Sequence, residues 1–182
     1  MNQLIKCLLL LSFLWSLSPL NAQNNTLIFP ERWQGVWSGE LVISTVKGEA
    51  QRIPMLLKLL PLEDGRYTYT IVYGEETEEN TRPYYLQAVE GEPGHFQVDE
   101  GNGIILDDYF INGKLYSRFE VMGTLLLSTV EERGDQLIYE IIAGPMEAIN
   151  ITGDTMIDEE EIPPVSSFAI NVQQRAVLSR KE

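Results

Sequence analysis

Turn-forming residue pairs interrupt the chain about every ten residues, and this spacing constrains the fold more than any other feature of the sequence. Asn112-Gly113 is the strongest of these signals, because a two-residue type I′ turn needs positive φ at both positions. Between the turns, residues of alternating character follow one another; Tyr67, Tyr69 and Tyr73, for example, share one face. A period of two residues is typical of a β-strand. The sequence therefore predicts short strands joined by hairpins.

About ten such segments can be counted along the chain. They are residues 36–45, 52–61, 66–73, 83–90, 95–100, 103–111, 114–122, 124–132, 136–143 and 167–179. Helical signals are weak, and only Thr26 to Gln34 could form a short helical turn. We expect an all-β fold, a single up-and-down antiparallel barrel of about 8–10 strands, because regular hairpins are typical of that architecture. A β-sandwich ranks second, since it more often needs long crossing connections.

The first 22 residues resemble a secretory signal peptide. Lys6 supplies the positive charge, and the apolar run Leu8 to Leu20 is too short to span a bilayer as a helix. A small residue precedes Gln23, where we expect cleavage; an uncleaved anchor is the alternative. We therefore expect residues 1–22 to be removed and residues 23–182 to form one domain, periplasmic or secreted.

Charge and residue counts exclude several classes of partner. The formal net charge is -14, whereas binding to nucleic acid or an anionic membrane surface requires a basic face. One Cys and one His cannot form a disulfide or a Cys/His zinc site. Lys58 interrupts the longest later apolar run, Met55 to Leu62, so no transmembrane segment is expected after the leader. We expect neither a metal nor a cofactor.

Gly35-Val36-Trp37 follows an irregular N-terminal segment directly, at the start of the first expected strand. This Gly-x-Trp motif resembles the opening of the calycins, the superfamily of lipocalins and fatty-acid-binding proteins. In calycins the Trp closes one end of the barrel and stacks against a basic residue from the last strand. The resemblance implies a closure made by Gly35, Trp37 and either Arg175 or Arg180. A guanidinium on an indole contributes about 1 kcal/mol when it is partly desolvated.

Two residues lie outside this match. Trp33 precedes the motif, and we expect it to contribute less to stability than Trp37. Haem-binding barrels of the superfamily use a histidine as the iron ligand, and His95 is the only histidine here. Because His95 lies beside a Pro-Gly turn, we expect it to be a surface residue.

Carboxylates are plentiful, but most of them fall in expected loops. A set around Gly101 and Gly103 could offer oxygen ligands to Ca²⁺, although its order differs from the EF-hand loop. That set is Asp99, Glu100, Asn102, Asp107 and Asp108. Glu75 to Asn80 and Asp158 to Glu161 are interpreted as solvated acidic loops. No nucleophile lies in a recognisable pattern with a base.

The strand after Asn112-Gly113 leaves two alternatives for a binding site. In ordinary alternation Leu115, Ser117, Phe119 and Val121 point inward, and Arg118 pairs with Glu120 in water. In the other alternative the lumen is partly polar, and Tyr116 and Arg118 reach a ligand carboxylate. The second arrangement is similar to that of small fatty-acid-binding barrels, which use Arg and Tyr inside the cavity.

Three functions remain open. The first is binding of a small apolar or amphipathic molecule inside the barrel, without catalysis, with Tyr67, Tyr69, Tyr116 and Arg118 as ligand-binding residues. Tyrosines would supply apolar walls with polar tips, and the candidates are Tyr67, Tyr69, Tyr73, Tyr84, Tyr85, Tyr109 and Tyr139. The second is a structural or protein-interaction barrel with a filled lumen that acts through its acidic loops. The third is an enzyme of the cyclase or isomerase type. The volume of the cavity distinguishes the first two: several hundred Å³ favours the binder, and a packed interior favours the structural or interaction barrel.

Overall fold

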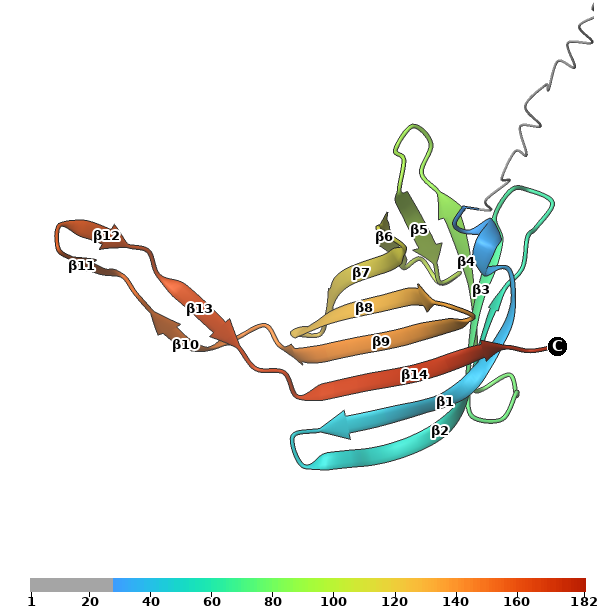
Figure 1. Ribbon diagram of the computed structural model, residues 1–182, viewed down its shortest axis with the longest axis horizontal. Coiled ribbons are helices and arrows are strands. Elements are labelled where there is room, and N and C mark those ends of the chain that lie inside the picture. Colours follow the sequence, from blue (N-terminus) through green and yellow to red (C-terminus); the bar gives the residue numbers. More distant parts are fainter. Residues whose placement is uncertain (1–27) are drawn as a thin grey trace, which may run out of the picture.

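The computed structural model describes residues 28–182, and ten of its strands form a closed antiparallel barrel (Figure 1). These strands are β1 (Gly35–Thr45), β2 (Gly48–Leu59), β3 (Tyr67–Tyr73), β4 (Thr81–Ala88), β5 (His95–Asp99), β6 (Ile105–Ile111), β7 (Lys114–Val121), β8 (Thr124–Arg133), β9 (Gln136–Pro145) and β14 (Val172–Arg180). The predicted all-β barrel is confirmed. The predicted signal peptide, Met1–Ala22, lies outside the described residues.

Nearly every strand pairs with its neighbour in sequence, so the barrel runs up and down from β1 to β9. It closes where β1 pairs with both β2 and β14. The tight hairpin between β6 and β7 has φ of 49° at Asn112 and 80° at Gly113. Both values are positive, as the type I′ turn predicted from this pair requires.

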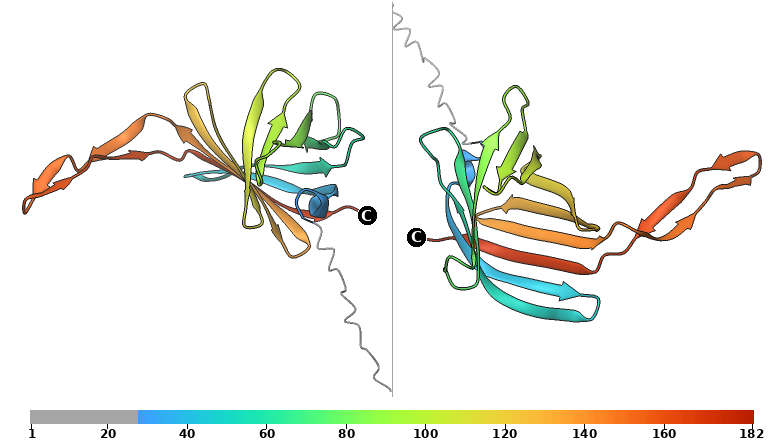
Figure 2. Two further views of the ribbon diagram at one scale, coloured as in Figure 1. Left: turned by 90° about the horizontal axis from the view of Figure 1, so that it is seen from above. Right: turned by 180° about the vertical axis from the view of Figure 1, so that it is seen from behind.

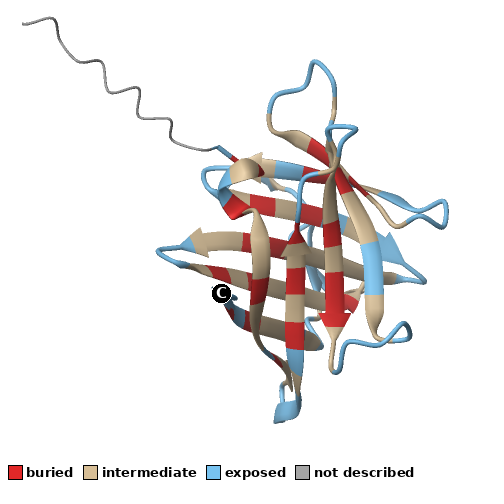
Figure 3. Cartoon of the chain, turned by 90° about the vertical axis from the view of Figure 1, so that its right-hand side faces the viewer, coloured by how far each residue is buried: buried red, intermediate tan, exposed pale blue. Residues whose placement is uncertain are grey.

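Alternation along the strands divides the barrel residues into an inward and an outward set. Figure 3 shows buried positions recurring between intermediate ones along several strands. The inward set forms the core, and its most deeply buried members are Trp37, Leu41, Met55, Leu57, Leu59, Leu86, Leu115, Val130, Leu137 and Leu178. On β7, Leu115 and Ser117 are buried while Arg118 is exposed, as ordinary alternation predicts. Val121, expected inward, is exposed at the end of the strand, and Glu120 accepts from the Gly123 amide instead of pairing with Arg118.

The 3₁₀ helix η1 (Glu31–Trp33) lies at one end of the barrel, where the sequence predicted a short helical turn. Phe29 stacks on Phe110 with ring centroids 4.5 Å apart, and Trp33 meets both rings edge-on. Trp33 and Trp37 are each only 2% exposed. Burial therefore does not support the expectation that Trp33 contributes less to stability than Trp37. The described residues contain no helix of the length and hydrophobicity that a membrane crossing requires.

Four further strands form an arm, residues 148–168, that projects away from the barrel between β9 and β14 (Figures 1 and 2). They are β10 (Ala148–Thr152), β11 (Thr155–Ile157), β12 (Glu160–Ile162) and β13 (Val165–Phe168). The acidic segment Asp158 to Glu161 is exposed, as expected, but it forms the tip of a hairpin. One expectation was wrong here: the last barrel strand begins at Val172 instead of residue 167. Alternation with a period of two residues is the same in the strands of an arm and of a barrel, so the sequence pattern did not separate them.

Replacing residues 148–167 with a short Gly-Ser linker is expected to leave the barrel folded. The arm pairs only with itself, β10 with β13 and β11 with β12, so its removal breaks no barrel ladder, and we expect the free energy of unfolding to change by less than about 1 kcal/mol. Thermal melts of both proteins measure this. A collapse of the melting temperature would show that the arm is part of the barrel's cooperative unit.

Candidate functional site

The closed end of the barrel is built by three residues of the Gly-x-Trp resemblance. The Arg180 guanidinium lies over the Trp37 ring, 4.3 Å from its centroid, and it donates hydrogen bonds to the carbonyl oxygens of Gln34 and Arg32. Gly35 has φ of +133°, and a Cβ there would lie 2.7 Å from Arg180 Nη1. Only glycine therefore fits beneath this stack.

Arg175, the other expected partner of Trp37, lies elsewhere. It is paired in register with Val42, and its Nε is 3.8 Å from Glu140 Oε2 on the neighbouring strand β9. Alternation with the buried Ala176 places Arg175 on the outer face. The structure thus places Arg180, and not Arg175, at the closed end.

A cavity of about 150 Å³ lies inside the barrel. Its polar wall consists of Tyr69, Tyr73, Tyr84, Glu100, Asp108, Ser117, Ser128 and Tyr139, and its apolar wall of Ile71, Val98, Leu106, Phe119 and Ile141. Apart from Glu100, which follows β5, these residues come from the inward faces of β3 to β9. No Lys, Arg or His is among them, so the cavity carries carboxylates without a cationic side chain in its wall.

Asp108 is the most unusual of the wall residues. Alternation on β6 places it between Leu106 and Phe110 on the inward face, and it is 4% exposed. Its Oδ1 has no hydrogen-bond partner, and neither has the Oγ of Ser117, its register partner on β7. Burial raises the pKa of Asp108 to about 7, against an opposing contribution from Ser117. A carboxyl group in this state changes its charge near neutral pH.

Two tyrosines bridge the cavity through their hydroxyl groups. The Oη atoms of Tyr73 and Tyr139 are 3.1 Å apart. Burial raises the pKa of both side chains. Burial also raises the pKa of Tyr69, and the nearby charge of Asp108 raises it further. These hydroxyls therefore stay protonated at neutral pH and act as neutral hydrogen-bonding groups.

Tyr73→Phe is expected to lower the free energy of unfolding by about 1–2 kcal/mol, because it leaves the buried Tyr139 hydroxyl without its partner. Thermal or urea melts of the purified variant measure this loss. Tyr85→Phe is the matched control, since Tyr85 lies on the outer face of β4 with Arg66 over its ring. Equal melting temperatures for both variants would show that the bridge contributes nothing.

The structure places the four predicted ligand-binding residues in different surroundings. Tyr69 lines the cavity. Tyr67 points to the closed end, where its hydroxyl donates to Glu31 at 3.3 Å. Tyr116 and Arg118 lie on the outer face of β7, because Ser117 between them faces inward. The expectation that Tyr116 and Arg118 reach a ligand in the lumen is therefore wrong.

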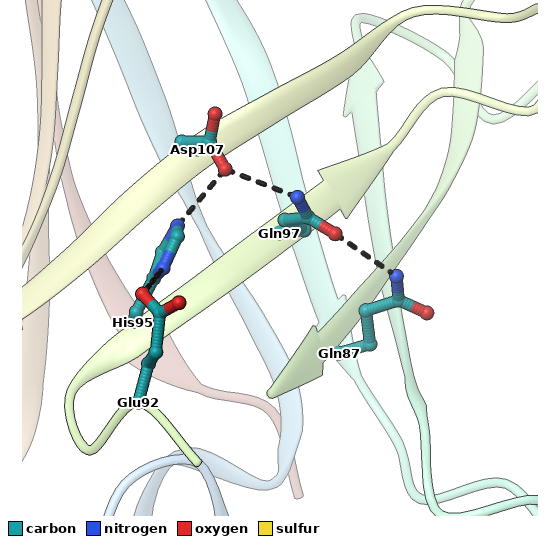
Figure 4. A network of polar contacts seen from close by, with 5 residues as sticks. All are labelled: Gln87, Glu92, His95, Gln97 and Asp107. Atoms are coloured by element: carbon teal, nitrogen blue, oxygen red, sulfur yellow. Dashed lines mark hydrogen bonds and ion pairs between the residues drawn. The ribbon is translucent and has the colours of Figure 1, made fainter. Parts of the chain in front are cut away.

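His95 also lies on the outer face, in the polar network of Figure 4. Its Nδ1 is 2.7 Å from Glu92 Oε2 and its Nε2 is 2.9 Å from Asp107 Oδ1. Gln97 donates to Asp107 as well, at 3.1 Å. The hydrogen bonds to Glu92 and Asp107 raise the pKa of His95. Both ring nitrogens are engaged outside the lumen, so His95 does not face a ligand there.

The carboxylates around Gly101 close their own turn. Asp99 Oδ1 accepts from the Gly101 amide at 2.8 Å, and Asn102 Oδ1 accepts from the Ile104 amide at 2.9 Å. Within residues 28–182, no three side chains of His, Cys, Asp or Glu are grouped so that they could hold a metal ion. Asp108, expected in this set, lies instead in the lumen.

Sequence reasoning placed Ser117 on the inward face but did not place Asp108 opposite it in the lumen. A signal for both was present, because each is a polar residue inside an apolar inward set: Leu106 and Phe110 on one strand, Leu115 and Phe119 on the next. Tyr73, Tyr84 and Tyr139 were expected as wall residues and do line the cavity. Tyr85 and Tyr109 face outward, and Tyr109 stacks on His95.

Comparison with known proteins finds a solved structure with a similar fold. No protein-family model and no curated protein matches the chain. Among solved structures, the chain is similar to the crystal structure of a protein with unknown function from the DUF3598 family of Nostoc punctiforme, with a TM-score of 0.53 and 12% identity. The match covers 80% of this chain and 47% of the other, about half its length. At this identity the likeness shows the fold alone: the chain is a ten-stranded antiparallel β-barrel with a structural neighbour in that family.

Proposed function

We propose that the chain is an exported, calycin-like barrel that binds one small amphipathic molecule in its lumen, without catalysis. The observation that carries this proposal is the cavity of about 150 Å³ with a mixed wall of apolar side chains, tyrosines and an unpartnered carboxyl group. Ligand sites are typically apolar cavities with a few convergent polar groups. The closure by Trp37 and Arg180 supports the relation to calycins.

The volume limits the size of the ligand. Sites for drug-sized molecules occupy about 300–1,000 Å³, and this cavity is smaller. A cavity of about 150 Å³ accommodates a molecule such as benzene. A long fatty acid is therefore too large for the described lumen, and a single ring or a short chain with one polar group fits.

Native mass spectrometry of the protein from its natural source tests the proposal. We expect a retained molecule of roughly 60–150 Da, the size that such a cavity holds. Ser128→Leu fills the lumen and should lose that molecule, whereas Ser179→Leu, on the outer face beside the buried Leu178, should retain it. A ligand held equally by both variants would place binding outside the lumen.

Export has its own test. The signal-peptide pattern of residues 1–22 supports it, and the expected mature protein begins at Gln23. Mass spectrometry of material recovered outside the cytoplasm should give the mass of residues 23–182, with Gln23 free or cyclised to pyroglutamate. Exported material that retains Met1 would refute cleavage.

A second function is favoured by the arm, which carries exposed apolar side chains on a two-stranded ribbon. They are Ile149, Ile151, Met156, Ile157, Val165 and Phe168. A two-stranded hairpin alone is marginally stable in water, so the arm is suited to pack on another chain. An outer pocket of about 420 Å³ lies at the base of the arm, lined by Leu125, Leu127 and Arg118 of the barrel and by Phe168 of the arm itself, and we propose that it receives the acidic arm of a second copy. Sedimentation of the full chain and of the arm-replaced variant tests this: only the full chain should self-associate.

A further inference from the structure

The Asp108 carboxyl group is buried in the wall of the barrel cavity, and the wall holds no side chain of opposite charge. It is 4% exposed, and its Oδ1 accepts no hydrogen bond from the described residues. A buried polar atom without a partner is costly, and natural proteins retain few of them. Because Asp108 interrupts an apolar inward set, replacing it by Leu or Val would remove that cost. The position is therefore suited to a role that requires a carboxyl group.

The other residues of the cavity wall favour a cationic ligand over an anionic one. Glu100 is the other charged side chain in the wall, and it is also acidic. An anionic ligand would be repelled by both carboxylates. A cation would pair with Asp108, and the aromatic faces of the surrounding tyrosines attract cations as well.

We propose, on the basis of the lumen-binding function above, that the ligand is a small primary ammonium ion whose apolar part is one ring or a short chain. The ammonium group donates to Asp108 Oδ1, and the Ser117 Oγ beside it accepts from the same head group. The apolar part packs against Leu106, Phe119 and Ile141. A buried charge pair is stable only when its remaining hydrogen bonds are satisfied, and the Ser117 hydroxyl provides one of them.

This arrangement predicts that binding depends on pH. An ammonium ion pairs with the ionised form of Asp108, whose pKa is raised to about 7 by burial. Affinity should therefore increase as the pH rises towards 7 and level off above it. The other titratable groups that face the cavity are Tyr69, Tyr73, Tyr84, Tyr139 and Glu100. Burial raises the pKa of these tyrosines, so they remain protonated in this range.

Calorimetric titration of the full chain with size-matched probes tests the proposal. The probes are n-butylammonium and benzylammonium, their neutral counterparts 1-butanol and benzyl alcohol, and the anions butyrate and benzoate. In phosphate buffer at pH 8, which contains no competing amine, we expect the ammonium ions to bind at least about tenfold more tightly than the alcohols, as for a charge-assisted hydrogen bond worth about 1.4 kcal/mol or more. The anions should not bind.

Two variants separate the carboxyl group from its surroundings. Asp108→Asn should remove the preference for ammonium over alcohol, while Asp107→Asn, the adjacent carboxylate on the outer face of the same strand, should retain it. If Asp108→Asn fails to fold, the pH dependence in the wild-type chain decides: a flat affinity for ammonium between pH 5 and 8 overturns the proposal. Alcohols that bind as tightly as amines would overturn the ammonium assignment and leave lumen binding intact. If no probe binds, the lumen-binding function fails, and the assignment fails with it.

Discussion

Trp37→Ala is expected to lower the free energy of unfolding by about 3–5 kcal/mol, the cost of emptying a large aromatic site in a packed core. Trp37 is 2% exposed, its Nε1 donates to the Trp33 carbonyl oxygen at 2.8 Å, and Arg180 covers its ring. The substitution removes all three contacts together. Since a domain has only about 5–15 kcal/mol of stability, the variant should melt early or express poorly. Urea and thermal melts measure the loss.

Two comparisons make this prediction specific. Trp33 is buried to the same extent and donates to Glu132 at 3.3 Å, so Trp33→Ala should cost about as much by the same cavity argument. Arg180→Ala leaves the core filled and removes only the stacked guanidinium, so its cost should be about 1–2 kcal/mol. A Trp37→Ala protein that melts within a degree or two of the wild type would contradict closure of the barrel at this end.

The barrel was predictable because its determinants are local. Asn112-Gly113 specifies a tight turn through the backbone angles that Asn and Gly tolerate, and the structure has that turn. Gly35 and Trp37 belong to one motif, and the structure brings both to Arg180. The choice between Arg175 and Arg180 required the register of β1 against β14. No local rule determines that register.

The lumen and the arm were harder to predict. Asp108 stands beside Asp107 in the sequence, and the two carboxylates differ only in the face of the strand that carries them. A shift of one residue in strand register exchanges the two faces. Without the strand pairing, the sequence analysis therefore placed Asp107 and Asp108 in a single acidic group. The arm was missed because β13 and β14 continue one alternating pattern, and only their different partners separate them.

Asp108→Asn is expected to change how stability depends on pH. In the native state burial raises the pKa of Asp108 from its ordinary value of 3.8 to about 7. The group therefore stabilises the fold fully below about pH 4, and this contribution is lost as the pH rises through 7, where the native state must hold a buried charge. Between pH 5 and 8 the wild-type chain should lose about 2–3 kcal/mol, or roughly 4–12 °C in melting temperature. The Asn variant, which cannot ionise, should lack that decline.

The difference in stability between the wild-type chain and the Asn variant separates the titration of Asp108 from that of His95, which also titrates in this range. The pKa of His95 is raised by Glu92 and Asp107, so its ion pairs also weaken as the pH rises above 6.5, but they do so equally in both proteins because His95 lies on the outer face. Melts in phosphate, without an amine buffer, therefore give two curves that diverge with rising pH. At pH 8 the Asn variant should be the more stable protein, since it avoids a buried ionised carboxyl group that has no cationic partner in the cavity wall. Parallel curves would mean that Asp108 is solvated or already paired in solution, and the cavity would then offer a cation no buried charge to bind.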